Sequence, residues 1–162
     1  MDVADRVVLI TGASSGVGAA LATQLGQMGA SVVVNYSRSA EAAEAVVEQI
    51  TGAGGQALAV QADVSEEADC KRLVATTVKQ FGQLDVLVNN AGTTTFVPHD
   101  QLDALTEDIW LRTLRVNLIG AFMMSREAAP HIEAAGGGEI VMTSSIASVT
   151  ANGSSIAYCA SK

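Results

Sequence analysis

Residues 6–18 read RVVLITGASSGVG, and this stretch decides the fold. The apolar run at its start, residues 6–10, predicts a buried strand. Glycines follow directly after this strand. A helix is then predicted that ends at Gly29. Its helical period places four apolar residues on one face: Val17, Leu21, Leu25 and Met28. A strand, a glycine-rich turn and a helix in this order favour a nucleotide-binding α/β unit.

The turn itself, residues 11–18, predicts a site for a pyrophosphate. Glycines let the backbone turn sharply and approach the phosphates, and the free N–H groups at the helix N-terminus meet the phosphate charge. A glycine-rich turn that binds nothing is the alternative. Three residues rather than one separate Gly12 from Gly16, so the spacing differs from the common G-x-G-x-x-G pattern. The expected cofactor-binding residues here are Gly12, Ser14, Ser15, Gly16, Val17 and Gly18.

The alternation of strand and helix patterns continues along the chain. Further strands are predicted at residues 31–35, 56–60, 84–89 and 139–143. Helices stop near Gly52 and Gly82, and a fourth begins near Thr106 and runs past Asn117 toward Pro130, which should kink or shorten it. We expect one dinucleotide-binding domain over residues 1–162, an α/β fold with a doubly wound parallel sheet of the Rossmann type and about five strands.

The composition argues against several classes of function. The 162 residues are 49% hydrophobic, and 17 acidic against 9 basic residues give a net charge of −8. The basic residues are scattered, so nucleic acid is not an expected partner. Residues 1–6 show no secretion signal, and no apolar run approaches the roughly 18–20 residues of a membrane span, so a cytoplasmic protein without membrane contact is expected. Cys70 and Cys159 predict reduced thiols, and no metal site is expected.

Further motifs follow the glycine-rich turn in order: Asn89-Asn90-Ala91-Gly92, Asn117, Ser145 and Tyr158-Cys159-Ala160-Ser161-Lys162. With this set the chain closely resembles the short-chain dehydrogenase/reductase family over its whole length. Ser145 lies 13 residues before Tyr158, the separation that places a strand-end serine beside the tyrosine in that family. The resemblance implies an oxidoreductase that transfers a hydride between a nicotinamide cofactor and a carbonyl or secondary alcohol.

Tyr158 is the expected general acid/base. Hydride transfer between a nicotinamide and a carbonyl carbon requires a proton at the oxygen. Tyrosine has a pKa of about 10, and the ammonium of Lys162, at i+4 on a helix, would favour the phenolate. The resemblance further implies that Lys162 binds the nicotinamide ribose, Ser145 hydrogen-bonds the substrate oxygen and Asn117 supports a water that links the lysine to solvent. Ser144 is the alternative to Ser145, and purely structural roles are the alternative for the whole set.

The segment after the second strand favours NADP(H) over NAD(H). An acid there would bind the adenosine ribose of NAD and repel a 2′-phosphate, but residues 35–38 read Asn-Tyr-Ser-Arg. Arg38 offers a guanidinium to a phosphate, with a solvated residue before the next helix as the alternative. Asp63 resembles the family's adenine-contacting aspartate, with a helix cap near Ser65 as the alternative, and Asn90 is expected to brace the central strand. The expected cofactor contacts beyond the first turn are Asn35, Tyr36, Ser37, Arg38, Asp63, Val64, Asn89, Ala91, Gly92, Tyr158 and Lys162.

The resemblance also implies properties of the whole protein. The chain ends at the Tyr-x-x-x-Lys motif, so we expect later strands and a substrate loop to be missing and residues 140–142 to form an unprotected apolar edge. We also expect these residues alone to bind dinucleotide weakly. The motifs are similar to those of 3-oxoacyl-carrier-protein reductases and glucose or polyol dehydrogenases, so the substrate stays open, and a homodimer or homotetramer is implied at full length. A non-catalytic dinucleotide-binding module or an inactive fragment is the alternative function.

Overall fold

Five parallel strands form one sheet in the computed structural model, which describes residues 3–162. Met1 and Asp2, the start of the segment searched for a secretion signal, lie outside the described residues. The strand order is β3-β2-β1-β4-β5, and all neighbouring pairs are parallel, which confirms the predicted doubly wound α/β fold. The strands are β1 (Val7–Ile10), β2 (Ser31–Tyr36), β3 (Gln56–Gln61), β4 (Val86–Asn89) and β5 (Glu139–Met142).

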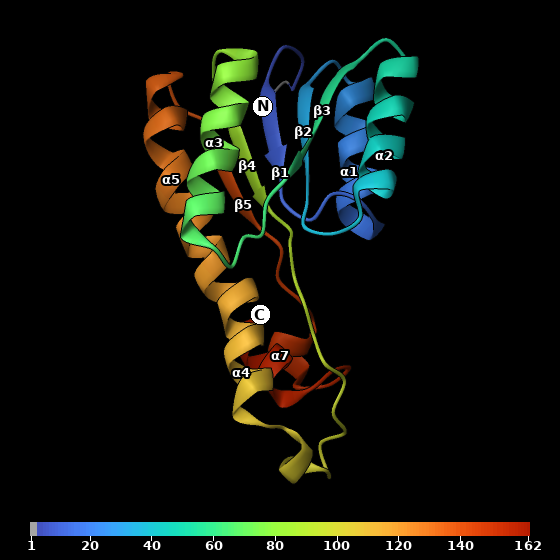
Figure 1. Ribbon diagram of the computed structural model, residues 1–162, viewed down its shortest axis with the longest axis vertical. Coiled ribbons are helices and arrows are strands. Elements are labelled where there is room, and N and C mark those ends of the chain that lie inside the picture. Colours follow the sequence, from blue (N-terminus) through green and yellow to red (C-terminus); the bar gives the residue numbers. More distant parts are fainter. Residues whose placement is uncertain (1–2) are drawn as a thin grey trace.

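Helices cover both faces of the sheet, α1 and α2 on one side and α3 and α5 on the other (Figure 1). Side chains alternate along a strand, so Leu9 and Leu87 pack on the α3 and α5 side. Val8 and Ile10 pack on the α1 and α2 side. Burial on both faces explains why the central strand β1 is apolar at every position. The covering helices are α1 (Gly16–Gln27), α2 (Ala40–Gly52), α3 (Glu67–Phe81) and α5 (Ala121–Ala134).

Helix α1 packs only the middle of its predicted apolar face, Leu21 and Leu25, against the core. Val17 is 72% exposed and Met28 is 60% exposed, so the predicted apolar face was wrong at both ends. The close approach of neighbouring helices is the reason, since a Cβ on Gly26 would lie 2.5 Å from Cγ2 of Ile50 in α2. The fully buried residues of α1 are therefore small ones at i, i+4 and i+8: Gly18, Ala22 and Gly26.

The predicted fourth helix has three segments. Helix α4 (Glu107–Leu114) continues into η2 (Arg115–Gly120), a π-helical turn that contains Asn117, and then into α5. The expectation that Pro130 would shorten the helix was wrong, because α5 continues to Ala134. Pro130 lies on the exposed face, where water can hydrogen-bond the carbonyl that its missing N–H leaves unpaired. π-Helical turns inside α-helices often occur at functional sites.

The segments that follow β4 and β5 lie beyond the carboxyl ends of the strands (Figure 1). They contain η1 (Leu102–Ala104), α6 (Ala147–Thr150) and α7 (Ile156–Ser161). Helix α7 packs against α4, so the end of the described chain meets the segment that follows β4. In open parallel sheets, ligands bind at this edge of the sheet. A ligand site is therefore expected at this edge.

The structure also describes the thiols and the edge strand. Cys70 is buried, Cys159 is half-buried, and both are free thiols. Ile140, Val141 and Met142 of β5 are 37%, 42% and 55% exposed, so this apolar edge is uncovered as predicted. Residues 3–162 hold no cluster of three or more His, Cys, Asp and Glu side chains that could bind a metal ion. Within the same residues, every helix is too short or too polar to span a membrane.

Candidate active site

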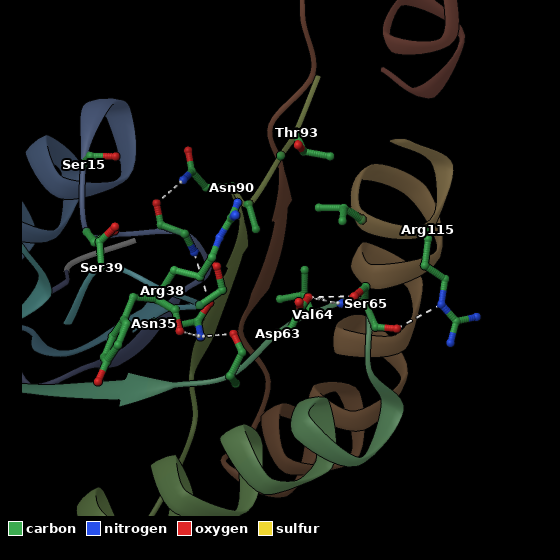
Figure 2. Close-up of a pocket in the computed structure, with 18 of the residues that line it drawn as sticks. Ser15, Asn35, Arg38, Ser39, Asp63, Val64, Ser65, Asn90, Thr93 and Arg115 are labelled. Carbon is green, nitrogen blue, oxygen red and sulfur yellow. Dashed lines mark hydrogen bonds between the residues drawn. The ribbon is translucent and has the colours of Figure 1, made fainter. Parts of the chain in front are cut away.

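A cavity of about 690 Å³ lies at the carboxyl ends of β1, β2 and β3. Figure 2 shows Ser15, Ser39 and Arg38 on one side of it. Arg115 lies on the other side, on the long helix formed by α4, η2 and α5. Most of the predicted cofactor-binding set lies here. The members that line the cavity are Gly12, Ser14, Ser15, Asn35, Tyr36, Ser37, Arg38, Asp63, Val64, Ala91 and Gly92.

The glycine-rich turn forms one wall of this cavity, and close backbone contacts require its glycines. Gly12 has a φ of 62°, and a Cβ there would lie 2.9 Å from Cα of Ala91. A Cβ on Gly18 would lie 2.7 Å from the carbonyl oxygen of Gly12. Within the described chain, no acceptor meets the N–H of Gly16, and the Ser15 hydroxyl does not cap the helix. The turn thus presents free donors at the positive end of α1, which suits a phosphate.

Two asparagines hold that turn in place. Asn35 Oδ1 accepts a hydrogen bond from the Gly12 N–H at 3.1 Å, while its Nδ2 donates to the Ala62 carbonyl at 3.0 Å. Asn90 Nδ2 donates to the carbonyls of Thr11 at 2.9 Å and Gly12 at 3.1 Å. Asn35 is only 1% exposed, and its hydrogen bond to Gly12 orients the turn. Asn90 braces the end of the central strand β4 against the same turn.

A second cavity of about 490 Å³ adjoins the first, because Asn90, Gly92 and Thr93 line both. Tyr158 of α7 and Lys162, the residue after that helix, line the second cavity. Ser145, which follows β5, and Ser144 line it too. The remaining lining residues are Thr94, Thr143, Ile146, Ala147, Asn152, Gly153 and Ser154. Three of the four predicted catalytic residues thus meet at one cavity.

The two serines after β5 differ in what their hydroxyls contact. Ser144 Oγ donates to the carbonyl oxygen of Lys162 at 2.9 Å. Ser145 Oγ accepts a hydrogen bond from the Ala147 N–H at 3.2 Å. The Ser145 hydroxyl proton therefore stays available to a ligand, whereas that of Ser144 is already used. This difference favours Ser145 as the hydroxyl that polarises a substrate oxygen.

Lys162 is half-buried, with its ammonium directed to the wall that the two cavities share. Its Nζ donates to the carbonyl oxygen of Thr143 at 3.0 Å, and a Cβ on Gly92 would lie 3.4 Å from Nζ. Burial lowers the pKa of the Lys162 ammonium from its usual value. A half-buried charge is screened by water less than an exposed one.

Asn117 connects α7 to the loop after β4. Its Oδ1 accepts a hydrogen bond from the Thr93 N–H at 2.7 Å, and its Nδ2 donates to the Thr93 carbonyl at 3.0 Å. Nδ2 also donates to Ser161 Oγ at 2.8 Å. The side chain is buried and holds α7 beside residue 93. The predicted contact of Asn117 with a water stays a prediction.

Some predicted cofactor-binding residues line neither cavity: Gly16, Val17, Gly18 and Asn89. Asn89 is buried, and its Nδ2 donates to Ser125 Oγ of α5 at 3.0 Å. Conversely, the first cavity has lining residues that were not among the predicted cofactor contacts: Ser39, Ala62, Ser65, Asn90, Thr93, Arg112, Arg115 and Val116. The two arginines stand three residues apart just before Asn117, a helical spacing that predicts one shared face.

The first cavity is basic although the chain is acidic. Arg38, Arg112 and Arg115 line it, and no carboxylate of residues 3–162 forms an ion pair with any of them. Asp63 is the acidic residue in its lining. The remaining arginines are paired on other surfaces. This distribution of charge favours an anionic ligand in the first cavity.

Comparisons with known proteins agree with this arrangement. A family model described as short chain dehydrogenase matches residues 6–162. The chain is 46% identical over 155 residues to a protein named as ketoacyl reductase 2 of the granaticin polyketide synthase from Streptomyces violaceoruber. It is 47% identical over 140 residues to versicolorin reductase 1 from Aspergillus parasiticus. These matches cover 96% and 86% of the chain, which spans 61% and 52% of those relatives' lengths.

Solved structures show the same similarity. A short-chain dehydrogenase/reductase from Burkholderia xenovorans superposes with a TM-score of 0.93 at 38% identity, covering 97% of this chain and 66% of that one. A xylitol dehydrogenase with bound NAD+ superposes with a TM-score of 0.91 at 29% identity, covering 100% of this chain and 61% of that one. Nearly all of the fold described above is therefore shared with these enzymes.

Proposed function

This chain belongs to the short-chain dehydrogenase family, and from that membership we propose that its protein transfers a hydride between NADP(H) and a carbonyl or secondary alcohol. One observation carries the proposal. Tyr158, Ser145 and Lys162 line a cavity that shares a wall with the cavity at the glycine-rich turn. A module that only bound a dinucleotide would have no use for Tyr158, Ser145 and Lys162 at one cavity.

The first cavity fits a dinucleotide. The N–H groups of the glycine-rich turn, whose residues Gly12, Ser14 and Ser15 line this cavity, would meet the pyrophosphate. Asp63 and Val64 would hold the adenine, and Lys162 would hold the nicotinamide ribose. When bound, a nicotinamide supplies or accepts the hydride.

The second cavity provides the proton. Reduction of a carbonyl leaves negative charge on its oxygen, and the phenol of Tyr158 donates the proton that neutralises this charge. Ser145 donates a hydrogen bond to the same oxygen. The ammonium of Lys162 stabilises the phenolate that remains, and solvent returns the proton to it. In alcohol oxidation the same groups act in reverse.

Arg38 is the basis of the proposed preference for NADP(H). Its exposed guanidinium lines the first cavity beside Ser37 and makes no ion pair or hydrogen bond with residues 3–162. A guanidinium can form two parallel hydrogen bonds to a phosphate. Residues 35–38 contain no acid that would repel a 2′-phosphate. Both features support the phosphorylated cofactor.

A ketone of polyketide type is the proposed substrate. Two relatives carry the names of a ketoacyl reductase and a versicolorin reductase, which supports reduction as the main direction. Thr94, Asn152 and Ile146 line the second cavity and offer a hydroxyl, an amide and an apolar surface. This mixture suits a carbon skeleton that carries several oxygens.

Fluorescence titration of NADPH and NADH tests the cofactor proposal. Arg38→Ala should weaken NADPH binding by about 10-fold or more and leave NADH binding nearly unchanged, because only NADPH has the 2′-phosphate. Lys79→Ala, an exposed cation at the end of α3, controls for the loss of one positive charge. Equal weakening by both variants would remove Arg38 from the phosphate site.

Turnover is then measured as NADPH oxidation in the presence of β-ketoacyl thioesters and polycyclic ketones. Oxidation that depends on the ketone is the expected result. Tight NADPH binding without oxidation by any of these ketones would favour a non-catalytic binding module.

A further inference from the structure

Arg115 hydrogen-bonds a loop that lies far from it in sequence. Its Nε donates to the carbonyl oxygen of Ser65 at 2.9 Å, across 50 residues of chain. Figure 2 shows this contact between the long helix and the loop after β3, on the opposite side of the cavity from Ser15. Arg38 and Arg112 line the same cavity, but their guanidinium groups form no hydrogen bond or ion pair within residues 3–162. Arg115 therefore differs from them in having a structural acceptor.

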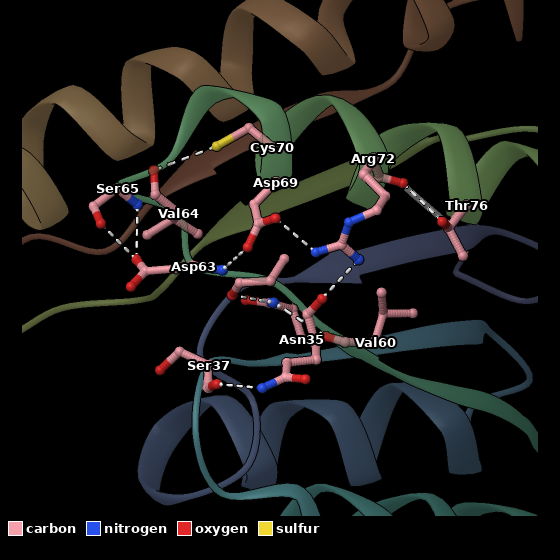
Figure 3. Close-up of polar contacts among 12 residues, drawn as sticks. Asn35, Ser37, Val60, Asp63, Val64, Ser65, Asp69, Cys70, Arg72 and Thr76 are labelled. Atoms are coloured by element: carbon pink, nitrogen blue, oxygen red, sulfur yellow. Dashed lines mark hydrogen bonds and ion pairs between the residues drawn. The ribbon is translucent and has the colours of Figure 1, made fainter.

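The loop that Arg115 contacts holds the Asp63 carboxylate in one orientation. The backbone N–H and the hydroxyl of Ser65 both donate to Asp63 Oδ1, at 2.9 and 2.7 Å. On the other side, the Asp63 N–H donates to Asp69 Oδ2 at 2.8 Å, and Asp69 is paired with Arg72 at 2.7 Å (Figure 3). Ser65 is thus the link between Arg115 and an exposed carboxylate at the cavity.

The π-helical turn η2 contacts this loop at a second point. A Cβ on Gly120 would lie 2.8 Å from the carbonyl oxygen of Val64. The first and last residues of η2 therefore face two consecutive carbonyls, those of Ser65 and Val64. Between them, Asn117 binds Thr93 and Ser161. One turn of helix thus contacts both the adenine side and the catalytic side of the site.

We propose that Arg115 is a positioning residue for the adenine half of the cofactor, acting through Ser65 on Asp63; this rests on the proposed function. The reason is preorganisation. A carboxylate that is already held in its binding orientation loses less freedom when a ligand arrives. Without Arg115, the Ser65 carbonyl loses its donor, and only packing, such as that of Gly120 and Val116 near Val64, would hold residues 63–65 to η2.

Titration of two half-cofactors tests this role. The probes are 2′,5′-ADP, which contains the adenine, and nicotinamide mononucleotide, which does not. Arg115→Ala should weaken 2′,5′-ADP binding roughly 3- to 10-fold, the effect of one hydrogen bond, and leave the mononucleotide unchanged. Arg115→Lys keeps a charged donor of similar reach and should recover most of the affinity.

Arg112→Ala separates positioning from simple charge, because Arg112 lies one helical turn earlier at the same cavity. Equal weakening of 2′,5′-ADP by Arg112→Ala and Arg115→Ala, or no recovery with Arg115→Lys, would overturn the positioning role. Unchanged 2′,5′-ADP binding in Arg115→Ala would overturn it as well. If the wild-type protein binds NADPH, each of these outcomes overturns only the positioning role and leaves the proposed function unaffected. A wild-type protein that binds no nicotinamide nucleotide would overturn both the positioning role and the proposed function.

Discussion

The phenol oxygen of Tyr158 is the one atom on which the proposed chemistry depends most directly. Tyr158→Phe removes that oxygen and keeps the half-buried ring. Ketone-dependent NADPH oxidation should fall about 100- to 10,000-fold, the usual contribution of a positioned acid, while NADPH affinity stays near wild type. Steady-state kinetics and fluorescence titration measure the two effects. Cys159→Ser, the next residue on α7, controls for disturbance of the helix, and retained turnover in Tyr158→Phe would exclude the tyrosine as the acid.

At this scale the sequence predicted which residues gather but not what each contacts. The family resemblance implied that Tyr158, Ser145 and Lys162 lie together, and all three line one cavity. Asn35 was predicted as a cofactor contact, yet its amide is bound to Gly12 and to residues of β3 and beyond, 23 to 27 positions away. Such bonds form only when distant strands pair. A pattern local to the sequence carries no information about them.

Among the elements, α1 depends on the absence of side chains at its sheet-facing positions. A Cβ on Gly18 would lie 2.5 Å from Asn90 Nδ2 and 2.7 Å from the Gly12 carbonyl oxygen. Gly18→Ala should therefore push α1 away from the sheet and lower the free energy of unfolding by about 1–3 kcal/mol, as overpacking commonly does. Because the same contacts shape the glycine-rich turn, NADPH binding should weaken too.

Chemical denaturation and NADPH titration measure both consequences of Gly18→Ala. Gly52→Ala, at the end of α2, is the matched control, since nothing lies within 4 Å of a Cβ built there. Alanine is the better helix former, so this control should be neutral or slightly stabilising. If Gly18→Ala matched the control in stability and binding, the close approach of α1 would not matter.

Strands were easier to predict than helices. The first strand was expected at residues 6–10 and is found at Val7–Ile10, because a strand buried on both faces is apolar at every position. The face of α1 was predicted from its largest apolar residues, whereas its buried residues are small, and Leu21 and Leu25 are only partly buried against the core. The π-helical turn at Arg115–Gly120 has no local signal, since it depends on packing between α4, α5 and the loop after β3.

Over the whole molecule, the two ends of the sheet have different tasks. The carboxyl ends of the strands carry both cavities, whereas the opposite end contains Asp85, just before β4, with a side chain that is 0% exposed. Asp85 Oδ1 accepts from Arg6 at 2.7 Å, and its Oδ2 accepts from the Val7 N–H at 2.8 Å and from Gln83 at 2.7 Å. This carboxylate joins β1 to β4 across the middle of the sheet.

The position of Asp85 predicts a loss of stability without a loss of binding. Burial alone would raise its pKa, but the Val7 N–H, Arg6 and Gln83 together lower it below the usual value. A lowered carboxyl pKa stabilises the fold above the unfolded-state pKa of about 4, and this contribution is lost as the pH falls through the folded-state pKa. Asp85→Asn should lower the free energy of unfolding by about 1–3 kcal/mol at pH 7. The free energy of unfolding of this variant should also fall less steeply as the pH is lowered.

Urea denaturation at pH 7 and pH 3 measures this change, with Asp103→Asn, an exposed acid in η1, as the control. NADPH affinity at pH 7 and a temperature where the variant is folded should equal that of wild type, because none of the side chains lining the two described cavities hydrogen-bonds Asp85. A variant that kept its stability, or one that bound NADPH many-fold more weakly while folded, would contradict this division. The second result would mean that strain at one end of the sheet reaches the glycine-rich turn along β1, and the two ends would then have to be treated as one coupled unit.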